Sequence, residues 1–261
     1  MSSSSQRQII FHFHLFKNAG TSIDVNLQRI FGDNFLAVEL GGPADLFPAQ
    51  DLFEVLESRP EIRAVSSHTM VLPAPPREGW QILPIIFLRH PLDRILSIYM
   101  YERAQESDSP GAILAKKWEF PDYVAGRLSS PQDLILRNWQ SRWLARDRVD
   151  VSHISSDDEA LFETASRVIA DFPFIGVVER FSESLHVLNS ICAQRSIPAT
   201  FRVEKENRSS NAEKSLSERL KMIREMIGDE LFLKLQQANS LDMRLHRLAI
   251  ETLERRLASS Q

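Results

Sequence analysis

The chain has 261 residues, of which 43% are hydrophobic and 25% are charged, a composition typical of a soluble globular protein. Its formal net charge of −4 argues against a general nucleic-acid-binding protein, because such proteins are basic overall. The length suffices to bury a sizeable core, and no repeat or long linker interrupts it. We therefore expect a single domain over residues 1–261, with residues 1–7 disordered.

Three features bear on the compartment. The segment Met1 to Gln6 is polar and serine-rich, without the apolar stretch of a signal peptide. The longest strongly apolar run, Ile82 to Leu88, is far shorter than the ~20 residues that a helix needs to cross a bilayer. The single cysteine, Cys192, permits no internal disulfide and has apolar neighbours, which indicates a packed helix side chain. We therefore expect a cytoplasmic protein with no transmembrane segment.

The most informative segment is FHFHLFKNAGTS, residues 11–22. Alternating apolar residues predict a strand over 9–16, and apolar residues at helical spacing predict a helix after Ser22. Between them stand Lys17 and the small or polar residues Asn18, Ala19, Gly20, Thr21 and Ser22. Ala19 and Gly20 let the backbone approach a ligand closely, and Thr21 and Ser22 can cap the helix.

Backbone N–H groups at the start of a helix, together with one cation, bind multiply charged phosphate or sulfate. The loop after residue 16 is therefore predicted to be an anion site, with an ordinary strand–helix loop as the alternative. It is not a Walker P-loop, because that motif places its lysine after the last glycine and Lys17 precedes Gly20.

His12 and His14 are two residues apart on the predicted strand, so they share a face. A zinc site would need further Cys, Asp or Glu ligands, and none stands at ligand spacing nearby. We therefore predict no metal site and expect His14 to pack beneath the loop.

Strand-like and helix-like segments alternate along the rest of the chain, which favours an α/β fold with a mostly parallel sheet. Strands are predicted over 35–40, 62–67, 81–88 and 173–178. Helices are predicted over 50–58, 92–101, 131–146, 159–170 and 182–195. The last fifty residues carry amphipathic patterns, so the C-terminal region is predicted to be helical.

A second segment, 82–99, predicts a buried strand that ends at Arg89 and a helix that carries Ser97. The carboxyl ends of parallel strands meet at one edge, so Arg89 is expected beside Lys17. Its guanidinium suits a phosphate, and Ser97 can add a hydroxyl. His68 follows another strand and can take a proton from a hydroxyl at the same edge. Each residue alone has a plainer interpretation, as a surface ion pair or a solvated side chain.

Residues 202–224 contain seven Lys or Arg against four Asp or Glu, a local excess of positive charge. Within this stretch Asn207, Arg208 and Ser209 could close over an anionic ligand. A solvated run of charges is the alternative.

These segments together resemble the carbohydrate sulfotransferases related to the heparan and uronyl 2-O-sulfotransferases. FHFHLFKNAGTS is similar to their 5′-phosphosulfate loop. FLRHPLDRILSIY is similar to their 3′-phosphate segment, in which an arginine and a serine eight residues later hold the 3′-phosphate. Weaker similarities follow in the family's order at 138–144, 174–185, 207–209 and 239–245, so the resemblance covers most of the chain.

The resemblance implies a P-loop-type parallel sheet flanked by helices and the cofactor 3′-phosphoadenosine 5′-phosphosulfate (PAPS), released as 3′,5′-adenosine bisphosphate (PAP). Lys17 and the loop 18–22 would hold the 5′-phosphosulfate, with the lysine charge at the bridging oxygen. Arg89 and Ser97 would hold the 3′-phosphate, and His68 would deprotonate the acceptor. The cofactor would also be bound by Asn207, Arg208 and Ser209. Relatives usually have Pro and Thr around the lysine, where this chain has Phe16 and Asn18.

Three functions fit the sequence. The favoured one is a sulfotransferase acting on a hydroxyl, most simply that of a sugar or glycan. The second is a P-loop-type kinase or NTPase, which lacks the Walker lysine and a clear Mg²⁺ aspartate after an apolar strand. The third is a nucleotide-binding relative without turnover. No nucleic-acid partner is predicted for any of them.

Overall fold

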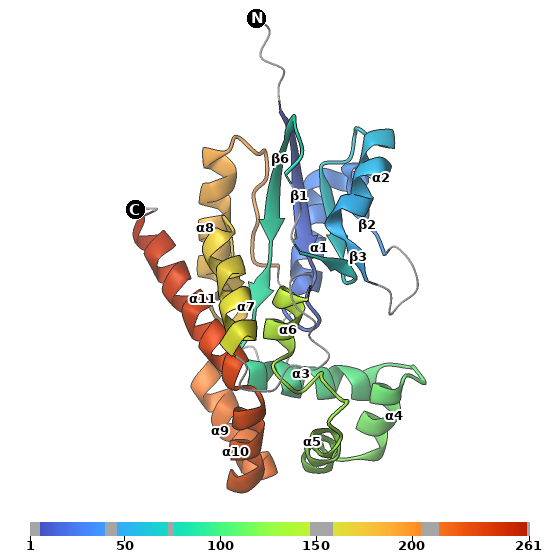
Figure 1. Cartoon of the computed structure of the whole chain (residues 1–261), viewed down its shortest axis with the longest axis vertical. Coiled ribbons are helices and arrows are strands. Elements are labelled where there is room, and N and C mark those ends of the chain that lie inside the picture. The colour runs from blue at the N-terminus through green and yellow to red at the C-terminus, as the bar shows by residue number, and fades with distance from the viewer. Residues whose placement is uncertain (1–5, 40–45, 73–75, 147–158, 205–213, 260–261) are drawn as a thin grey trace, which may run out of the picture.

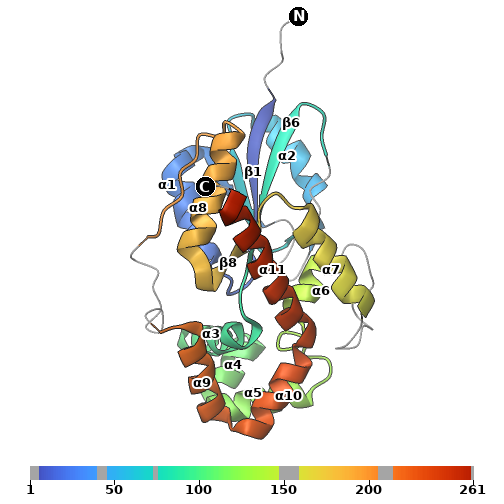
Figure 2. The same cartoon turned by 90° about the vertical axis from the view of Figure 1, so that its left-hand side faces the viewer.

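The structure is a computed structural model that describes residues 6–39, 46–72, 76–146, 159–204 and 214–259 (Figures 1 and 2). Its centre is a four-stranded parallel sheet in the order β2-β4-β1-β6. Its strands are β1 (Arg7–Phe13), β2 (Phe35–Ala37), β4 (Ala64–Ser67) and β6 (Trp80–Ile85). Two short parallel pairs join it, β3 (Phe47–Pro48) with β5 (Met70–Val71) and β7 (Phe87–Leu88) with β8 (Gly176–Val177).

Helices cover both faces of the sheet. In Figure 2, α1 (Gly20–Phe31) and α8 (Phe181–Gln194) lie to one side of β1 and β6. On the other side lie α2 (Leu52–Ser58) and α7 (Glu159–Asp171). The long α11 (Ser240–Ser259) packs against both α7 and α8. The predicted α/β fold with a parallel sheet flanked by helices is confirmed.

A helical layer lies beyond the carboxyl ends of the strands (Figure 1). It contains α3 (Pro91–Ala104), α4 (Pro110–Lys117), α5 (Phe120–Ser129), α9 (Leu216–Ile227) and α10 (Asp229–Ala238). This layer has its own buried core, separate from the core around the sheet, with residues such as Ile95, Tyr123 and Leu235. The C-terminal region is helical, as predicted.

The sequence explains why β1 is central and β6 is an edge. Ile9 to Phe13 are each no more than 1% exposed, so this strand is covered on both faces and paired along both sides. Pro84 lies in β6, opposite Phe11. Proline has no N–H to donate, and β6 has a neighbour only on its β1 side in the four-stranded sheet, the kind of strand in which proline is tolerated.

Several boundaries differ from the predictions. β1 begins at Arg7, inside the segment expected to be disordered, because the Arg7 guanidinium donates to the carbonyls of Leu56, Arg59 and Ile62. It ends at Phe13 rather than residue 16, since the chain turns where Asn18 N–H donates to Leu15 O. The predicted strand 81–88 is two strands. After Ile85 the chain leaves β1, and Phe87 and Leu88 pair with β8 instead.

The predicted helix over 131–146 is wrong for its first half, because only α6 (Trp139–Ala145) is helical. Asn138 interrupts the pattern with φ 45°, a left-handed conformation. Its side-chain oxygen accepts the N–H groups of Leu241 and Asp242 at 3.0 and 3.2 Å, which fixes this turn to the start of α11. Two predicted strands are shorter in the structure, at 35–37 and 176–177.

One helix, α4, was not predicted, although a proline in its first turn is a start signal in the sequence. Cys192 lies in α8 with no exposed surface, as predicted, and burial raises the pKa of its thiol to about 12. Within the part of the chain that the structure describes, no helix is long and apolar enough to cross a membrane.

Candidate functional site

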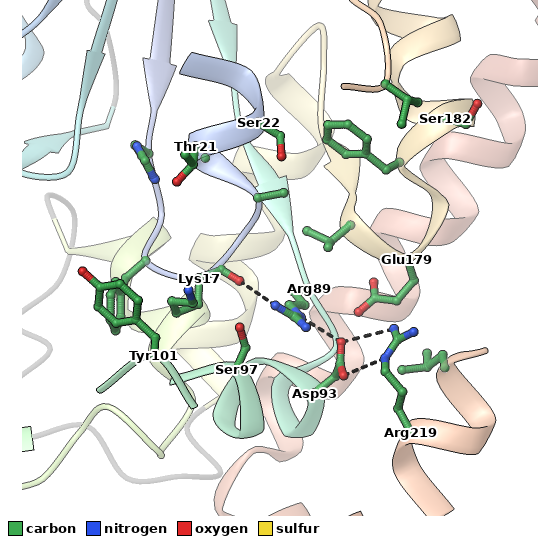
Figure 3. Close-up of a pocket in the computed structure, with 18 of the residues that line it drawn as sticks. Lys17, Thr21, Ser22, Arg89, Asp93, Ser97, Tyr101, Glu179, Ser182 and Arg219 are labelled. Atoms are coloured by element: carbon green, nitrogen blue, oxygen red, sulfur yellow. Dashed lines mark hydrogen bonds and ion pairs between the residues drawn. The ribbon is translucent and has the colours of Figure 1, made fainter. Parts of the chain in front are cut away.

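A pocket of about 860 Å³ lies at the carboxyl ends of β1 and β4, where segments far apart in the sequence meet (Figure 3). It is lined by the β1–α1 loop, α3, the start of α8 and the start of α9. Eight of the residues predicted to bind or react line it: Lys17, Ala19, Gly20, Thr21, Ser22, His68, Arg89 and Ser97. The predicted residues Asn207, Arg208 and Ser209 lie outside the described residues.

The β1–α1 loop turns backbone N–H groups toward this pocket. Lys17 and Ala19 are both left-handed, with φ 63° and 61°, and turns of this kind gather successive N–H groups on one concave side. The N–H groups of Ala19, Gly20 and Thr21 donate no hydrogen bond to any residue that the structure describes. The loop therefore offers free donors at the positive end of a 12-residue helix, which suits an anion.

The expected capping of α1 by Thr21 and Ser22 is wrong. α1 begins at Gly20, and its N-cap position belongs to Ala19, whose side chain cannot accept a hydrogen bond. Thr21 and Ser22 lie within the first turn and face the pocket (Figure 3). Because no side chain caps this helix, its first N–H groups stay available to a ligand.

Gly20 is required by its contact with His14. A Cβ at Gly20 would lie 1.8 Å from Cδ2 and 2.0 Å from Nε2 of His14, far inside van der Waals distance. The imidazole thus fills the space that any other side chain at residue 20 would need. His14 packs beneath the loop, as predicted, and is only 8% exposed.

Asn18 does not act as predicted, because its side chain points into the protein rather than into the pocket. It is 1% exposed, and its Nδ2 donates to Phe87 O at 2.8 Å and to Gln140 Oε1 at 2.7 Å. Its backbone N–H is also used, by Leu15 O at 3.1 Å. Asn18 therefore ties the loop to β7 and α6, and Gln140 is 122 residues away, so no local pattern could reveal this.

Lys17 brings a cation without a counter-ion to the pocket. Its Nζ lies 4.3 Å from the centre of the Tyr101 ring, and no carboxylate among the described residues forms an ion pair with it. Burial and the nearby Arg89 charge lower its pKa. Since two cations are held close together here, an anion between them would be favoured.

Arg89 is fixed beside Lys17, as the shared strand edge predicts. Its Nη1 donates to Lys17 O at 3.2 Å, and its Nε donates to Asp93 Oδ2 at 2.8 Å. Asp93 also accepts from Arg219 of α9, at 2.8 and 3.2 Å (Figure 3). Burial alone would raise the pKa of Asp93, but the Arg89 and Arg219 charges lower it below its usual value.

Neither Asp93 nor Arg219 was predicted as a site residue from the sequence. Asp93 stands four residues after Arg89 on one helix face, and this spacing is a usable signal. Arg219 stands 126 residues from Asp93, so only the folded chain shows that they meet.

His68 is oriented by a carboxylate, Glu39, that was not predicted as a site residue either. Its Nδ1 lies 2.9 Å from Oε1 of Glu39, which also accepts the backbone N–H of His68 at 2.9 Å. Burial acts to raise the pKa of Glu39, but hydrogen bonds from His68, Thr69 and Ser67 have the larger combined effect. The pKa is lowered as a result, and the carboxylate stays ionised. An ionised Glu39 accepts Nδ1–H, which leaves the Nε2 lone pair of His68 available to accept a proton. The His68 ring also stacks on His14, with ring centres 3.8 Å apart.

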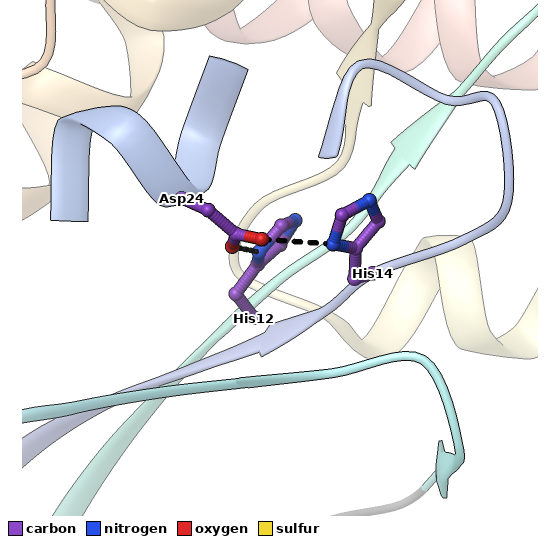
Figure 4. A group of neighbouring side chains, drawn as sticks. All are labelled: His12, His14 and Asp24. Atoms are coloured by element: carbon purple, nitrogen blue, oxygen red, sulfur yellow. Dashed lines mark hydrogen bonds and ion pairs between the residues drawn. The ribbon is translucent and has the colours of Figure 1, made fainter. Parts of the chain in front are cut away.

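His12 and His14 do have a carboxylate partner, contrary to the sequence argument (Figure 4). Asp24 of α1 lies between them, with its oxygens 2.8 Å from Nδ1 of His12 and 2.9 Å from Nδ1 of His14. Hydrogen bonds from both rings lower the pKa of Asp24 despite the opposing effect of burial. The three possible ligand atoms lie within 4.8 Å of one another. The short N···O distances are those of hydrogen bonds, so in this structure Asp24 is the acceptor shared by the two rings.

The acidic side chains that line the pocket are all engaged. Asp93 is held by two arginines, and Glu204 pairs with Arg29 and Arg202. Glu179 accepts from Nε2 of His246 at 2.9 Å and from the N–H of His90 at 2.8 Å. Free donors and cations therefore dominate the part of the pocket that the structure describes.

Comparison with known proteins shows the family but no activity. No family model matches the sequence. An uncharacterized protein of Archaeoglobus fulgidus is 35% identical over 246 residues, which cover 91% of this chain and 94% of the archaeal protein. The chain belongs to the family of that protein. Neither comparison tests the resemblance to sulfotransferases, so that resemblance stays a prediction.

The chemistry open to this family member follows from its pocket. The loop and Lys17 present free N–H donors and a cation suited to one anion, and Arg89 with Ser97 presents donors suited to a second. Apolar side chains, including Val178, Phe181 and Leu216, line the same pocket. A ligand with two anionic groups and a flat apolar portion would match this set of groups, and the His68–Glu39 pair lines the same pocket with an imidazole that can accept a proton.

Proposed function

We propose that this protein is a sulfotransferase that transfers a sulfuryl group from PAPS to a hydroxyl of an acceptor, most simply a carbohydrate. One observation carries the proposal. The β1–α1 loop with Lys17 lines a single pocket together with Arg89, Ser97 and apolar side chains. Lys17 and Arg89 meet there although they are 72 residues apart in the sequence. PAPS carries an anionic group at each end of its ribose and an adenine base, so its chemistry matches this donor set.

The engaged carboxylates support sulfate transfer over phosphate transfer. ATP-dependent kinases hold Mg²⁺ with carboxylates near the phosphates. Here the pocket carboxylates are held by arginines or histidines, as for Asp93 and Glu179. Lys17 also enters before the glycine of the loop rather than after it. A donor that needs no metal bridge fits these residues better than Mg-ATP does.

PAPS would supply the sulfuryl group and a leaving group that departs as PAP. The protein's own residues bind and orient the donor and accept the proton of the acceptor hydroxyl. The loop N–H groups and Lys17 place fixed positive charge where negative charge grows on the leaving oxygen. His68 Nε2 accepts the proton of the acceptor hydroxyl, and Glu39 stabilises the imidazolium that results. Arg89 and Ser97 hold the far end of the donor, which fixes its position for in-line transfer.

Ligand-dependent thermal unfolding tests the donor, with PAP and Mg-ATP added to separate samples of the full chain. We expect PAP to raise the unfolding temperature and Mg-ATP to leave it unchanged, because a ligand that binds only the native state stabilises it. The reverse result would replace sulfate transfer with phosphate transfer.

Turnover is tested with isotopically labelled PAPS and a panel of sugars and phenols, read as a sulfate adduct by mass spectrometry. Binding of PAP without any adduct or PAPS consumption would indicate a nucleotide-binding protein.

A further inference from the structure

Arg219 is a charged residue of the pocket for which the proposed function has no role. It lies in α9, directly after the capping box formed by Ser215 and Glu218. Its Nε and Nη2 donate to both oxygens of Asp93, and its Nη1 donates to Lys214 O. The guanidinium is therefore held on the α3 side of the pocket, by the same carboxylate, Asp93, that binds Arg89 (Figure 3).

Arg89, Asp93 and Arg219 form a compact group of two guanidinium groups around one carboxylate. The side chains are 16%, 2% and 12% exposed, respectively. Two guanidinium charges face one carboxylate, so the group keeps a net charge of +1 while largely removed from water. Such a charge is costly unless an anion compensates it.

Donor geometry leads to the same conclusion. A guanidinium has five N–H donors. Arg89 uses two of them, toward Asp93 and Lys17 O, and its Nη2 donates to no residue in the described chain. Arg219 uses three. Asp93 accepts one bond from Arg89 and two from Arg219, and donors on both arginines remain for a ligand in the pocket that they line.

We propose that Arg219 is a second guanidinium ligand of the 3′-phosphate, and that Asp93 is the positioning residue that presents Arg89 and Arg219 together. Two guanidinium groups with Ser97 match a phosphate dianion, whereas a ribose 3′-hydroxyl would leave the net positive charge of the group without compensation. Arg219 is thereby a specificity-determining residue that selects a 3′-phosphorylated nucleotide. This inference rests on the proposed use of PAPS.

A thermodynamic cycle between residue and ligand tests the inference. The dissociation constants of PAP and of AMP, which lacks the 3′-phosphate, are measured by calorimetry for the full-length wild type and Arg219→Ala. We expect the variant to bind PAP at least tenfold more weakly, the loss typical of a charge-assisted contact, and AMP within twofold of wild type. Arg224→Ala is the matched control, because Arg224 lies on the same helix and pairs with Asp229 at the surface. It should change neither constant.

Each outcome has a separate meaning. Equal weakening for PAP and AMP, or no weakening for either, would overturn the role of Arg219 while PAPS use stands. A wild type that binds PAP no better than AMP would overturn PAPS use and, with it, this inference. If Arg219→Ala fails to fold, Arg219→Lys keeps a charge beside Asp93 but loses the fork. A PAP-selective loss of at least threefold is then expected, and its absence counts against the proposal.

Discussion

Replacing Gly20 with alanine tests whether His14 fixes the anion loop. The new Cβ would lie 1.8, 2.0 and 2.5 Å from Cδ2, Nε2 and Cγ of His14, so one of the two groups must move. The imidazole cannot swing away freely, because Asp24 holds its Nδ1 at 2.9 Å and His68 stacks against it. Gly20→Ala must therefore shift the loop or break the bond to Asp24.

The expected cost follows from these two routes. Overpacking a well-filled site costs about 1–3 kcal/mol, and losing a hydrogen bond to a charged group costs about 1.5–3 kcal/mol. We therefore expect Gly20→Ala to lower the free energy of unfolding by about 2–4 kcal/mol, measured by urea denaturation. PAP binding should weaken as well, because the loop N–H groups move with Gly20.

A double-variant cycle gives the sharpest control. In a His14→Ala background the space beside residue 20 is vacant, so Gly20→Ala should then cost no more than about 0.5 kcal/mol. Thr21→Ala, at the next and more exposed position, should stay within about 0.5 kcal/mol of wild type. Equal costs of Gly20→Ala with and without His14 would refute the reasoning, since the penalty would then have nothing to do with the imidazole.

Four further predictions follow from single residues. Ala19→Gly should raise the free energy of unfolding by up to about 1 kcal/mol in urea, because φ 61° strains any residue with a Cβ; a decrease would contradict this. Arg89→Ala should weaken PAP binding at least ~10-fold in calorimetry, since a charge-assisted contact is lost, and unchanged binding would remove Arg89 from the site. His68→Ala should spare PAP binding but reduce turnover of labelled PAPS by ~10²-fold or more, as loss of a general base does; unchanged turnover would exclude His68 as the base. Burial lowers the pKa of His90 to about 4. Between about pH 6.5 and 4 the imidazole of His90 therefore binds a proton in the unfolded chain but not in the native state. The free energy of unfolding should fall by about 3 kcal/mol across that window as pH decreases, and His90→Gln should flatten the dependence in denaturation curves at several pH values.

Much of the fold could be predicted because local patterns decide it. The alternation in residues 9–13 and the apolar run in 82–88 indicate buried strands, and both exist. The helix after the loop and the α8 helix likewise follow from apolar spacing. The prediction over 131–146 was wrong because apolar residues also pack from turns. Leu136 has no exposed surface although it precedes α6, and Asn138 redirects the chain to meet α11.

For the site, the sequence by itself determined which groups stand at the strand ends. Lys17 and His68 follow β1 and β4 of the four-stranded sheet, and Arg89 follows β7, just beyond the end of β6, so the order of strands in the chain places all three at one edge. The tertiary structure decided what those groups face. It turned Asn18 inward, placed Asp24 between two histidines, and brought Arg219 to Asp93 across 126 residues. The physical reason is that periodicity fixes the direction of a side chain relative to its own strand or helix. The partner that it meets depends on how distant segments pack, and the local pattern does not contain that packing.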